Sequence, residues 1–310
     1  MSAFVSGMRG AFLYLSRQRT LRRYMETSGQ AQRLTSRFVA GLELEDGLEV
    51  AGQLRSRGIY SSLDHLGENV STEAEAASGR DAYLGALDAI AAAGLPSTVS
   101  VKVTSLGLDI SPELCMANTE AIVRKAAMTG SLVECDMEDS SYTDRTLDIV
   151  HEMQRRYPGR VRAVIQAYLY RSEGDIDDLN ARQIPVRLCK GAYREPAAVA
   201  WQEKHEVDAS YVKLMKKLLD HGEYPAIASH DDAILREALA HVSSRRIDPD
   251  AFEFQMLYGV RRKLQRQVVA KGFRLRLYVP YGQAWYPYFM RRLAERPANV
   301  LFVARSLVGD

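Results

Sequence analysis

The sequence is poor in cysteine and has no long apolar run, and each absence excludes a class of protein. Its three cysteines, Cys115, Cys135 and Cys189, are odd in number and widely spaced among 310 residues. This spacing argues against a disulfide framework and against a thiolate zinc site, so a reducing, cytoplasmic setting is expected. No run approaches the roughly eighteen apolar residues that a membrane-spanning helix needs.

Acidic residues are scarce at both ends of the chain. Residues 261–310 contain eleven Lys or Arg but only two acids, and the first acid of the chain, Glu26, follows five arginines. A basic end of this kind fits an anionic ligand or an acidic lipid surface, although a solvated basic face is the commoner meaning. Nucleic acid is not expected as a partner, because the sequence has no zinc-finger spacing and no RNP-type motif.

Residues 1–45 predict a helical arm that precedes the main domain. Phe12, Leu15 and Leu21 can share an apolar side of a helix, with arginines on the opposite side. The lack of acids also faintly resembles an organellar transit peptide. We favour the amphipathic arm, and we expect residues 46–310 to form one domain.

From about Leu42 onward, short apolar runs alternate with longer helical patterns. The predicted strands are 58–66, 98–103, 132–137, 161–167, 185–188, 226–229, 252–256 and 274–279. The predicted helices are 72–93, 112–128, 144–156, 175–182, 196–219, 231–242, 261–271 and 283–296. Eight such units in one chain of this length predict a closed, TIM-like (β/α)8 barrel of the α/β class. A doubly wound open sheet is the alternative, but GIYSSLDHLGE lacks the glycine-rich turn of that fold.

Polar residues lie at or just past the end of each predicted strand. They are Glu68, Lys102, Asp136, Gln166, Arg187 with Lys190, Ser229 with His230, Gln255 and Tyr278. In such a barrel the chemistry lies at the carboxyl ends of the strands, so these side chains are expected to converge. Taken singly, Lys102 could reach solvent from a strand face, and Asp136 or His230 could cap a turn or helix.

The residue types in this set favour some classes of protein over others. A metal hydrolase needs several His and carboxylate ligands, yet only His230 and His65 are candidates, so no metal is expected. A Schiff-base aldolase could use Lys102 or Lys190. A binding module without catalysis, built on the basic ends, is a third possibility.

The segment Tyr278–Glu295, YVPYGQAWYPYFMRRLAE, adds a cationic and aromatic helix to this set. At 3.6 residues per turn, Tyr288 and Arg292 share a face, flanked by Arg291 and Glu295. A guanidinium group matches a carboxylate in bidentate fashion, although arginine pairs on helices are more often solvated. Cations around an aromatic pocket are typical of redox chemistry on a small amino or hydroxy acid with an organic cofactor.

The order of motifs SVKVTSLGLD, ECDMED, VIQAYLYR, VRLCKGAY, SHDD, FEFQML and YVPYGQAWYPYFMRRLAERPAN resembles the proline dehydrogenase family, over residues 58–307. The resemblance implies a distorted barrel with FAD across the strand ends. It also implies oxidation of L-proline to Δ1-pyrroline-5-carboxylate, with hydride passing from proline C5 to flavin N5. This reaction is the first step of proline catabolism to glutamate.

The resemblance also implies roles for individual residues. Arg291 and Arg292, with Lys102 as a third cation, would bind the proline carboxylate. Glu295 would hold an arginine, and Glu68 resembles a gate residue that pairs with one. The walls around the proline ring would be Tyr278, Tyr288, Tyr193 and Leu257.

On the cofactor side, the family likeness places Arg187 beside flavin N5, Gln166 at the edge of the flavin ring, and Asp136 near both substrate and flavin. The remaining FAD contacts would come from Lys190, Gly191, Ala192, Ser229 and His230. Ser229 stands where many members have Thr, which keeps the hydroxyl, and Cys189 replaces a commoner apolar residue.

The resemblance is to the short monofunctional bacterial form, because the chain ends soon after the barrel. In the family a membrane quinone reoxidises the flavin, which implies a membrane quinone as partner and a transient, peripheral position at the inner face of the cytoplasmic membrane. The oligomeric state stays open.

Overall fold

The fold is taken from a computed structural model, which describes residues 36–67 and 70–295; from 291 to 295 only the backbone is described. Most of the predicted N-terminal arm, residues 1–35, therefore lies outside the described residues. Within the described ranges, no helix is both long and apolar enough to cross a membrane.

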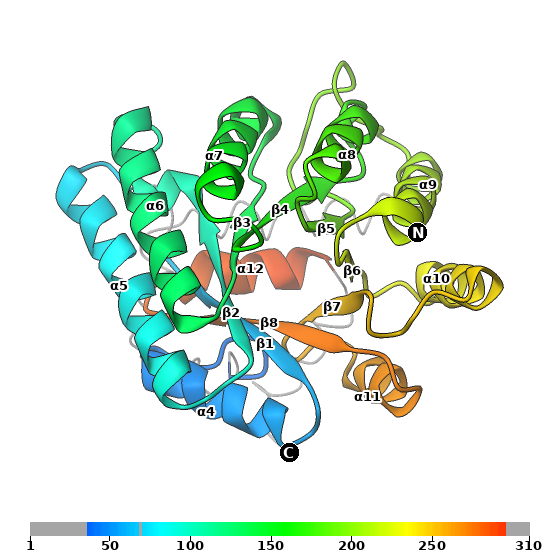
Figure 1. Ribbon diagram of the computed structural model, residues 1–310, viewed down its shortest axis with the longest axis horizontal. Coiled ribbons are helices and arrows are strands. Elements are labelled where there is room, and N and C mark those ends of the chain that lie inside the picture. Colours follow the sequence, from blue (N-terminus) through cyan, green and yellow to red (C-terminus); the bar gives the residue numbers. More distant parts are fainter. Residues whose placement is uncertain (1–35, 68–69, 296–310) are drawn as a thin grey trace.

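Eight parallel strands form a closed barrel (Figure 1). The strands are β1 (Tyr60–His65), β2 (Ser97–Lys102), β3 (Val133–Asp136), β4 (Val161–Gln166), β5 (Val186–Cys189), β6 (Ala226–Ala228), β7 (Glu253–Leu257) and β8 (Leu275–Tyr281). The barrel closes where β1 pairs with β8, from Tyr60 opposite Arg276 to His65 opposite Tyr281. The predicted barrel is confirmed, and the open-sheet alternative is wrong because an open sheet would leave these two strands unpaired.

Helices alternate with the strands, and most of them surround the barrel (Figure 1). They are α4 (Leu44–Arg55), α5 (Glu73–Ala92), α6 (Pro112–Thr129), α7 (Thr143–Arg156), α8 (Ser172–Ala181), α9 (Lys204–His221), α10 (Asp232–Arg245), α11 (Arg262–Ala270) and α12 (Trp285–Glu295), with two 3-10 turns, η1 (Val103–Leu106) and η2 (Ser140–Tyr142). Each of the eight predicted helices has a counterpart. The sequence prediction missed α4, although its buried Val50, Ala51 and Leu54 have helical spacing.

One helix begins later than predicted. The expected helix 196–219 starts at Lys204, after a capping box formed by Glu203 and Glu206. The preceding segment pairs with the loop after β4: the Trp201 amide donates to the Tyr168 carbonyl at 2.8 Å, and Ala200 forms an isolated antiparallel bridge with Leu169. These contacts use backbone groups that a helix would need internally, so the helix cannot extend back to residue 196.

Helix α12 lies across the barrel at the end where the carboxyl ends of the strands meet, which we call the mouth (Figure 1). It carries part of a buried group that we call the α12 cluster: Phe38, Val39, Leu66, Val260, Trp285, Tyr286, Tyr288, Phe289 and Met290. Leu66 and Val260 follow β1 and β7, the two neighbours of β8, so the cluster lies at the mouth on the side of these three strands. Helix α4 packs instead on the outside near β8, where an added Cβ at Gly47 would lie 3.3 Å from the Tyr281 ring.

The chain reverses into α12 at Gly282. Its φ of 120° is a conformation that residues with a side chain rarely adopt, and an added Cβ would lie 3.2 Å from the Leu66 nitrogen. The Gly282 amide donates to the Gly41 carbonyl at 3.0 Å, and the Ala40 amide donates to the Pro280 carbonyl at 2.8 Å. Residues 36–42 thereby hold the start of α12 over the mouth.

The interior of the barrel is polar. In β2, Val99 and Val101 belong to the main hydrophobic core, whereas Thr98, Ser100 and Lys102 alternate with them. Side chains alternate between the two faces of a strand, so these polar residues point inward. Barrels of this type usually have branched apolar residues in the interior. The polar interior of this barrel therefore differs from the usual packing.

Candidate active site

Most predicted site residues lie at or beside the mouth. Lys102, Asp136, Gln166 and Leu257 each end a strand, Lys190 to Ala192 follow β5 directly, and Ser229 and His230 follow β6. Three expectations differ in detail. Arg187, Gln255 and Tyr278 lie inside β5, β7 and β8 rather than at the ends of these strands, and Gln255 is buried inside the barrel.

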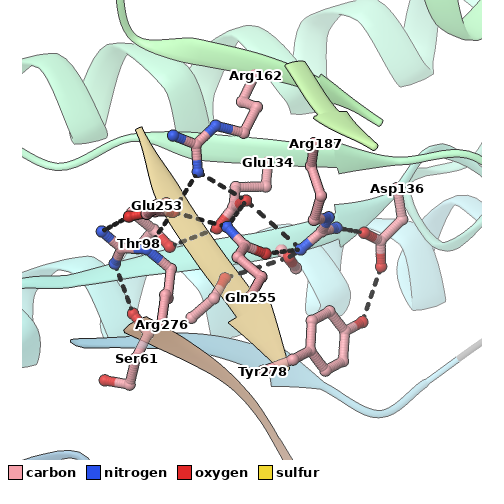
Figure 2. Close-up of polar contacts among 12 residues, drawn as sticks. Ser61, Thr98, Glu134, Asp136, Arg162, Arg187, Glu253, Gln255, Arg276 and Tyr278 are labelled. Atoms are coloured by element: carbon pink, nitrogen blue, oxygen red, sulfur yellow. Dashed lines mark hydrogen bonds and ion pairs between the residues drawn. The ribbon is translucent and has the colours of Figure 1, made fainter. Parts of the chain in front are cut away.

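Asp136 is the centre of the hydrogen-bond network at the mouth (Figure 2). One carboxylate oxygen accepts a hydrogen bond from Arg187 Nη2, and the other accepts from the Tyr278 hydroxyl at 2.7 Å. The Arg187 guanidinium carbon lies 5.4 Å from the centre of the Tyr278 ring. Asp136 thus fixes a cation and a phenol side by side, and it is not the cap of the following turn, a role that Asp139 fills.

Lys102 points into the same site rather than to solvent. Its Nζ lies 3.2 Å from Asp64 Oδ1, 3.6 Å from Asp136 Oδ2 and 3.4 Å from the Tyr278 hydroxyl. Sequence reasoning missed Asp64, which is fully buried. The segment YSSLDH contains the information needed to predict it, because alternation along β1 places Asp64 on the inward face with Ser62.

The surroundings fix the charge states of Arg187 and Tyr278. Burial opposes the charged form of Arg187, but Asp136 and Glu134 more than offset it and raise the pKa of this guanidinium. Burial, together with the negative charges of Asp136 and Asp64, raises the pKa of Tyr278 well above its usual value. Near neutral pH the site therefore holds a permanent cation and a protonated phenol that donates hydrogen bonds.

A second polar group lies beneath the mouth, toward the amino ends of the strands, and we call it the cage: Glu134, Arg162, Glu253 and Arg276 (Figure 2). Arg162 Nη1 donates to Glu253 at 2.7 Å and to Glu134 at 3.2 Å. Arg276 donates to Glu253 from Nε at 2.9 Å and from Nη2 at 3.1 Å. Sequence reasoning missed the cage, because its members lie on four different strands and in no shared motif.

Gln166 forms hydrogen bonds to the loops after β3 and β5, beside the predicted position of the edge of the flavin ring. Its Nε2 donates to the Glu138 carbonyl at 2.7 Å, and its Oε1 accepts from the Ala192 amide at 3.4 Å. Gly191 has a φ of 117°, and a Cβ there would lie 2.4 Å from the Tyr168 ring. Only glycine fits this turn, which brings the backbone of 190–192 close to the mouth.

Lys190, Ser229 and His230 lie on neighbouring loops. Lys190 Nζ is 2.5 Å from Asp208 and 2.9 Å from Asp231, while Ser229 Oγ accepts from the Asp231 amide at 3.1 Å. His230 is not the cap of α10, since Asp231 fills that position. Instead, His230 Nε2 accepts from the Leu257 amide at 2.9 Å, which leaves Nδ1 as the protonated nitrogen of a neutral ring.

The predicted walls of the substrate pocket differ in exposure. Tyr288 belongs to the buried α12 cluster, and Leu257 and Tyr278 pack against that cluster. Tyr193, in the loop after β5, is 39% exposed. The predicted gate Glu68 lies outside the described residues, as do the side chains of Arg291, Arg292 and Glu295, although their backbone belongs to α12.

Among the described residues, no group of three or more His, Cys, Asp and Glu side chains could hold a metal ion. The donors that do converge are an invariably charged guanidinium, a lysine, amide and hydroxyl groups, and the backbone around a glycine. Such donors suit a large organic anion such as a dinucleotide cofactor rather than a metal ion.

Comparisons with known proteins agree with this geometry. A sequence model of a family described as proline dehydrogenase matches residues 48–305. Proline dehydrogenase 1 of Bacillus subtilis subsp. natto is 40% identical over 302 residues, which cover 97% of this chain and 99% of the relative. Proline dehydrogenase of Deinococcus radiodurans is 39% identical over 89% of this chain and 90% of its own length.

A solved structure gives the same result for the fold. Proline utilization A (PutA) from Bdellovibrio bacteriovorus, in a form inactivated by N-propargylglycine, superposes with a TM-score of 0.79 at 28% identity and covers 85% of this chain. The match spans only 32% of that longer protein. Because both the family model and relatives of matching length extend over nearly the whole barrel, the chain belongs to the proline dehydrogenase family.

Proposed function

We propose that this protein oxidises L-proline to Δ1-pyrroline-5-carboxylate with a bound FAD, as the first step of proline catabolism. The observation that carries the proposal is the group formed by Lys102, Asp136, Arg187 and Tyr278 beneath α12. When bound, FAD would accept the hydride from proline C5 at its N5. The protein's own part is to bind both molecules, orient them and hold charge where it develops.

Arg187 is the proposed partner of the flavin ring. Its charge is permanent, and its guanidinium is fixed from both sides, so it can stabilise negative charge without reorganising. Gln166 would bind the edge of the ring. The backbone of Lys190, Gly191 and Ala192, with Ser229 and His230, would hold the ribityl and pyrophosphate groups, because the loops after β5 and β6 lie together at one side of the mouth.

The substrate carboxylate is proposed to bind Arg291 and Arg292 of α12, with Lys102 as a third cation. Tyr278, Tyr288, Leu257 and Tyr193 would enclose the ring, while Glu295 orients an arginine and Glu68 closes the empty pocket. Asp136 would hold Tyr278 and Arg187 in the correct relative position, since its two carboxylate oxygens bond to them separately.

The aldolase alternative receives no support from the two candidate lysines. Lys102 and Lys190 both lie in ion pairs with carboxylates, whereas a Schiff-base lysine must react as a neutral amine. The experiment that decides is the absorption spectrum of the purified protein with and without L-proline. We expect a yellow protein with a flavin spectrum that bleaches on adding proline; a colourless protein, or a flavin that proline does not reduce, would contradict the proposal.

We further propose a membrane quinone as the electron acceptor and a cytoplasmic protein that visits the inner face of the membrane transiently. The excess of Lys and Arg in residues 1–25 and 261–310 supports this part, because basic segments are attracted to anionic lipid. Co-sedimentation with anionic vesicles at low salt, after reduction with proline, is the test. If the reduced protein stays in the supernatant, the basic segments do not serve as a membrane contact.

A further inference from the structure

Burial of the charged groups of the cage is unfavourable in free energy, which indicates a role for them beyond stability. Glu134 and Glu253 are fully buried, and Arg162 is 1% exposed. Moving such ions out of water costs several kcal/mol each even after relaxation, and apolar residues of similar size often serve stability as well. An interior of ions is therefore poorly explained by stability alone.

Glu134 is the member of the cage that reaches the site. Its Oε1 accepts from the Thr98 hydroxyl at 2.7 Å. Its Oε2 accepts from Gln255 Nε2 at 2.9 Å and from Arg162 at 3.2 Å, and it lies 3.4 Å from Arg187 Nη1. The carboxylate is thus held by three donors and faces Arg187 on the side opposite Asp136 (Figure 2).

The guanidinium of Arg187 is consequently fixed on two sides. Nη1 donates to Ser100 Oγ and to Gln255 Oε1, both at 3.2 Å, on the side of Glu134. Nη2 donates to Asp136 on the side of the mouth. Gln255 Nε2 donates to Glu134 at 2.9 Å and to Glu253 at 2.8 Å, so both carboxylates orient this amide, but only Glu134 also lies against Arg187 itself.

We propose that Glu134 is a positioning residue for the oxidation of proline: it fixes the orientation of Arg187 and balances its charge from the closed side of the barrel, without touching substrate or flavin. The inference rests on the proposed function, in which Arg187 lies beside the flavin. The charge balance agrees with it, because three arginines, Arg162, Arg187 and Arg276, face three carboxylates, Glu134, Glu253 and Asp136.

The test compares Glu134→Gln with Glu253→Gln in the full-length, flavin-loaded protein. Both variants delete one buried charge from the same cage with little change of shape. Glu253 bonds to Arg162, Arg276, Gln255 and Tyr224 rather than to Arg187. We expect both to lower the melting temperature, but only Glu134→Gln to lower kcat by about tenfold or more, with KM for proline changing less than about threefold.

Combining each of these two variants with Arg187→Lys distinguishes a positioning role of Glu134 from a purely structural one. If Glu134 acts through Arg187, then Glu134→Gln lowers kcat much less in the Arg187→Lys background than in the wild type, whereas Glu253→Gln has the same effect in both. Equal losses of kcat for Glu134→Gln and Glu253→Gln, or independent multiplication of the Glu134→Gln and Arg187→Lys effects, would overturn the proposal.

Two further measurements keep the test decisive. If Glu134→Gln does not fold, Thr98→Val loosens the same carboxylate by removing its 2.7 Å hydrogen bond; an unchanged kcat in Thr98→Val then overturns the proposal, and a fall of about threefold at constant KM supports it. A double-mutant cycle on the unfolding midpoints, with Glu134→Gln and Arg187→Lys alone and together, measures the coupling between these two side chains. Failure of the proposed function would instead appear as an unbleached flavin in the wild type.

Discussion

Tyr278 makes two polar contacts whose loss can be measured separately from packing. Its hydroxyl donates to Asp136 at 2.7 Å and lies 3.4 Å from Lys102 Nζ, while its ring packs against the α12 cluster. Replacement by Phe keeps the ring and deletes only the hydroxyl. The effect of this change therefore reports on the polar part of the site alone.

We expect Tyr278→Phe to lower kcat/KM for proline by about tenfold to a hundredfold. A hydrogen bond to a charged group contributes about 1.5–3 kcal/mol, and the loss leaves both Asp136 and Lys102 less constrained. Steady-state kinetics measures the change.

The control is Tyr224→Phe, which deletes a similar phenol–carboxylate hydrogen bond of 3.2 Å at the opposite end of the barrel. Equal losses of kcat/KM in both variants would contradict a specific role of the Tyr278 hydroxyl in the active site.

Arg291 and Arg292 provide the residue-scale test of substrate recognition. Replacement of either by Met is expected to weaken proline binding by about tenfold to a hundredfold, because one charge-assisted bond is lost. Titration of the flavin spectrum with proline or with a carboxylate analogue measures the affinity. Unchanged affinity in both variants would refute the assignment of this pair to the substrate carboxylate.

At the scale of elements, the position of α12 distinguishes this barrel from a regular one. The helix covers the mouth instead of the outer wall, and Gly282 is the turn that redirects the chain. Sequence patterns predicted the helix. They could not show where the helix packs, because an apolar helix face fits the mouth and the outer wall equally well.

We expect Gly282→Ala to destabilise the fold by about 1–3 kcal/mol, since a φ of 120° is strained for alanine. The new methyl group would also meet the backbone of Leu66, displace α12 and lower proline affinity by about tenfold or more. Gly272→Ala is the matched control, because φ is 82° there but the space is open. Thermal unfolding and proline titration together decide; equal affinity losses in the two variants would contradict the role of the turn.

At the scale of the whole molecule, the polar interior makes stability depend on pH. Burial alone would raise the pKa of Glu253, but Arg276 and Arg162 lower it from 4.5 to about 2. Burial is likewise overcome at Glu134, whose pKa is held below its usual value by Arg187, Arg162 and Arg276. In the folded state both carboxylates therefore resist protonation more than in the unfolded chain.

The sign of the pH effect follows from these lowered values. The stabilisation is fully present above about pH 4.5 and is lost as pH falls toward 2, because the unfolded chain binds protons first. We expect Glu253→Gln to be less stable than the wild type at pH 7 and to lose less stability between pH 4.5 and 2. Urea unfolding across this range is the measurement. The exposed Glu223→Gln should keep the wild-type slope; a wild-type slope in Glu253→Gln would contradict the role of the cage.

Local sequence patterns were sufficient to predict the eight strand–helix units, the barrel and the family, because period-2 and period-3.6 patterns are local and the motifs are contiguous. They also placed Lys102, Asp136 and Gln166 at strand ends, since the end of an apolar run can be recognised locally. Three features became visible only in the folded chain: Asp64 completes the site, α12 crosses the mouth, and Glu134 contacts Arg187. These contacts join residues from different strands, and their geometry depends on the closure of the barrel, which brings inward-facing side chains together across its axis.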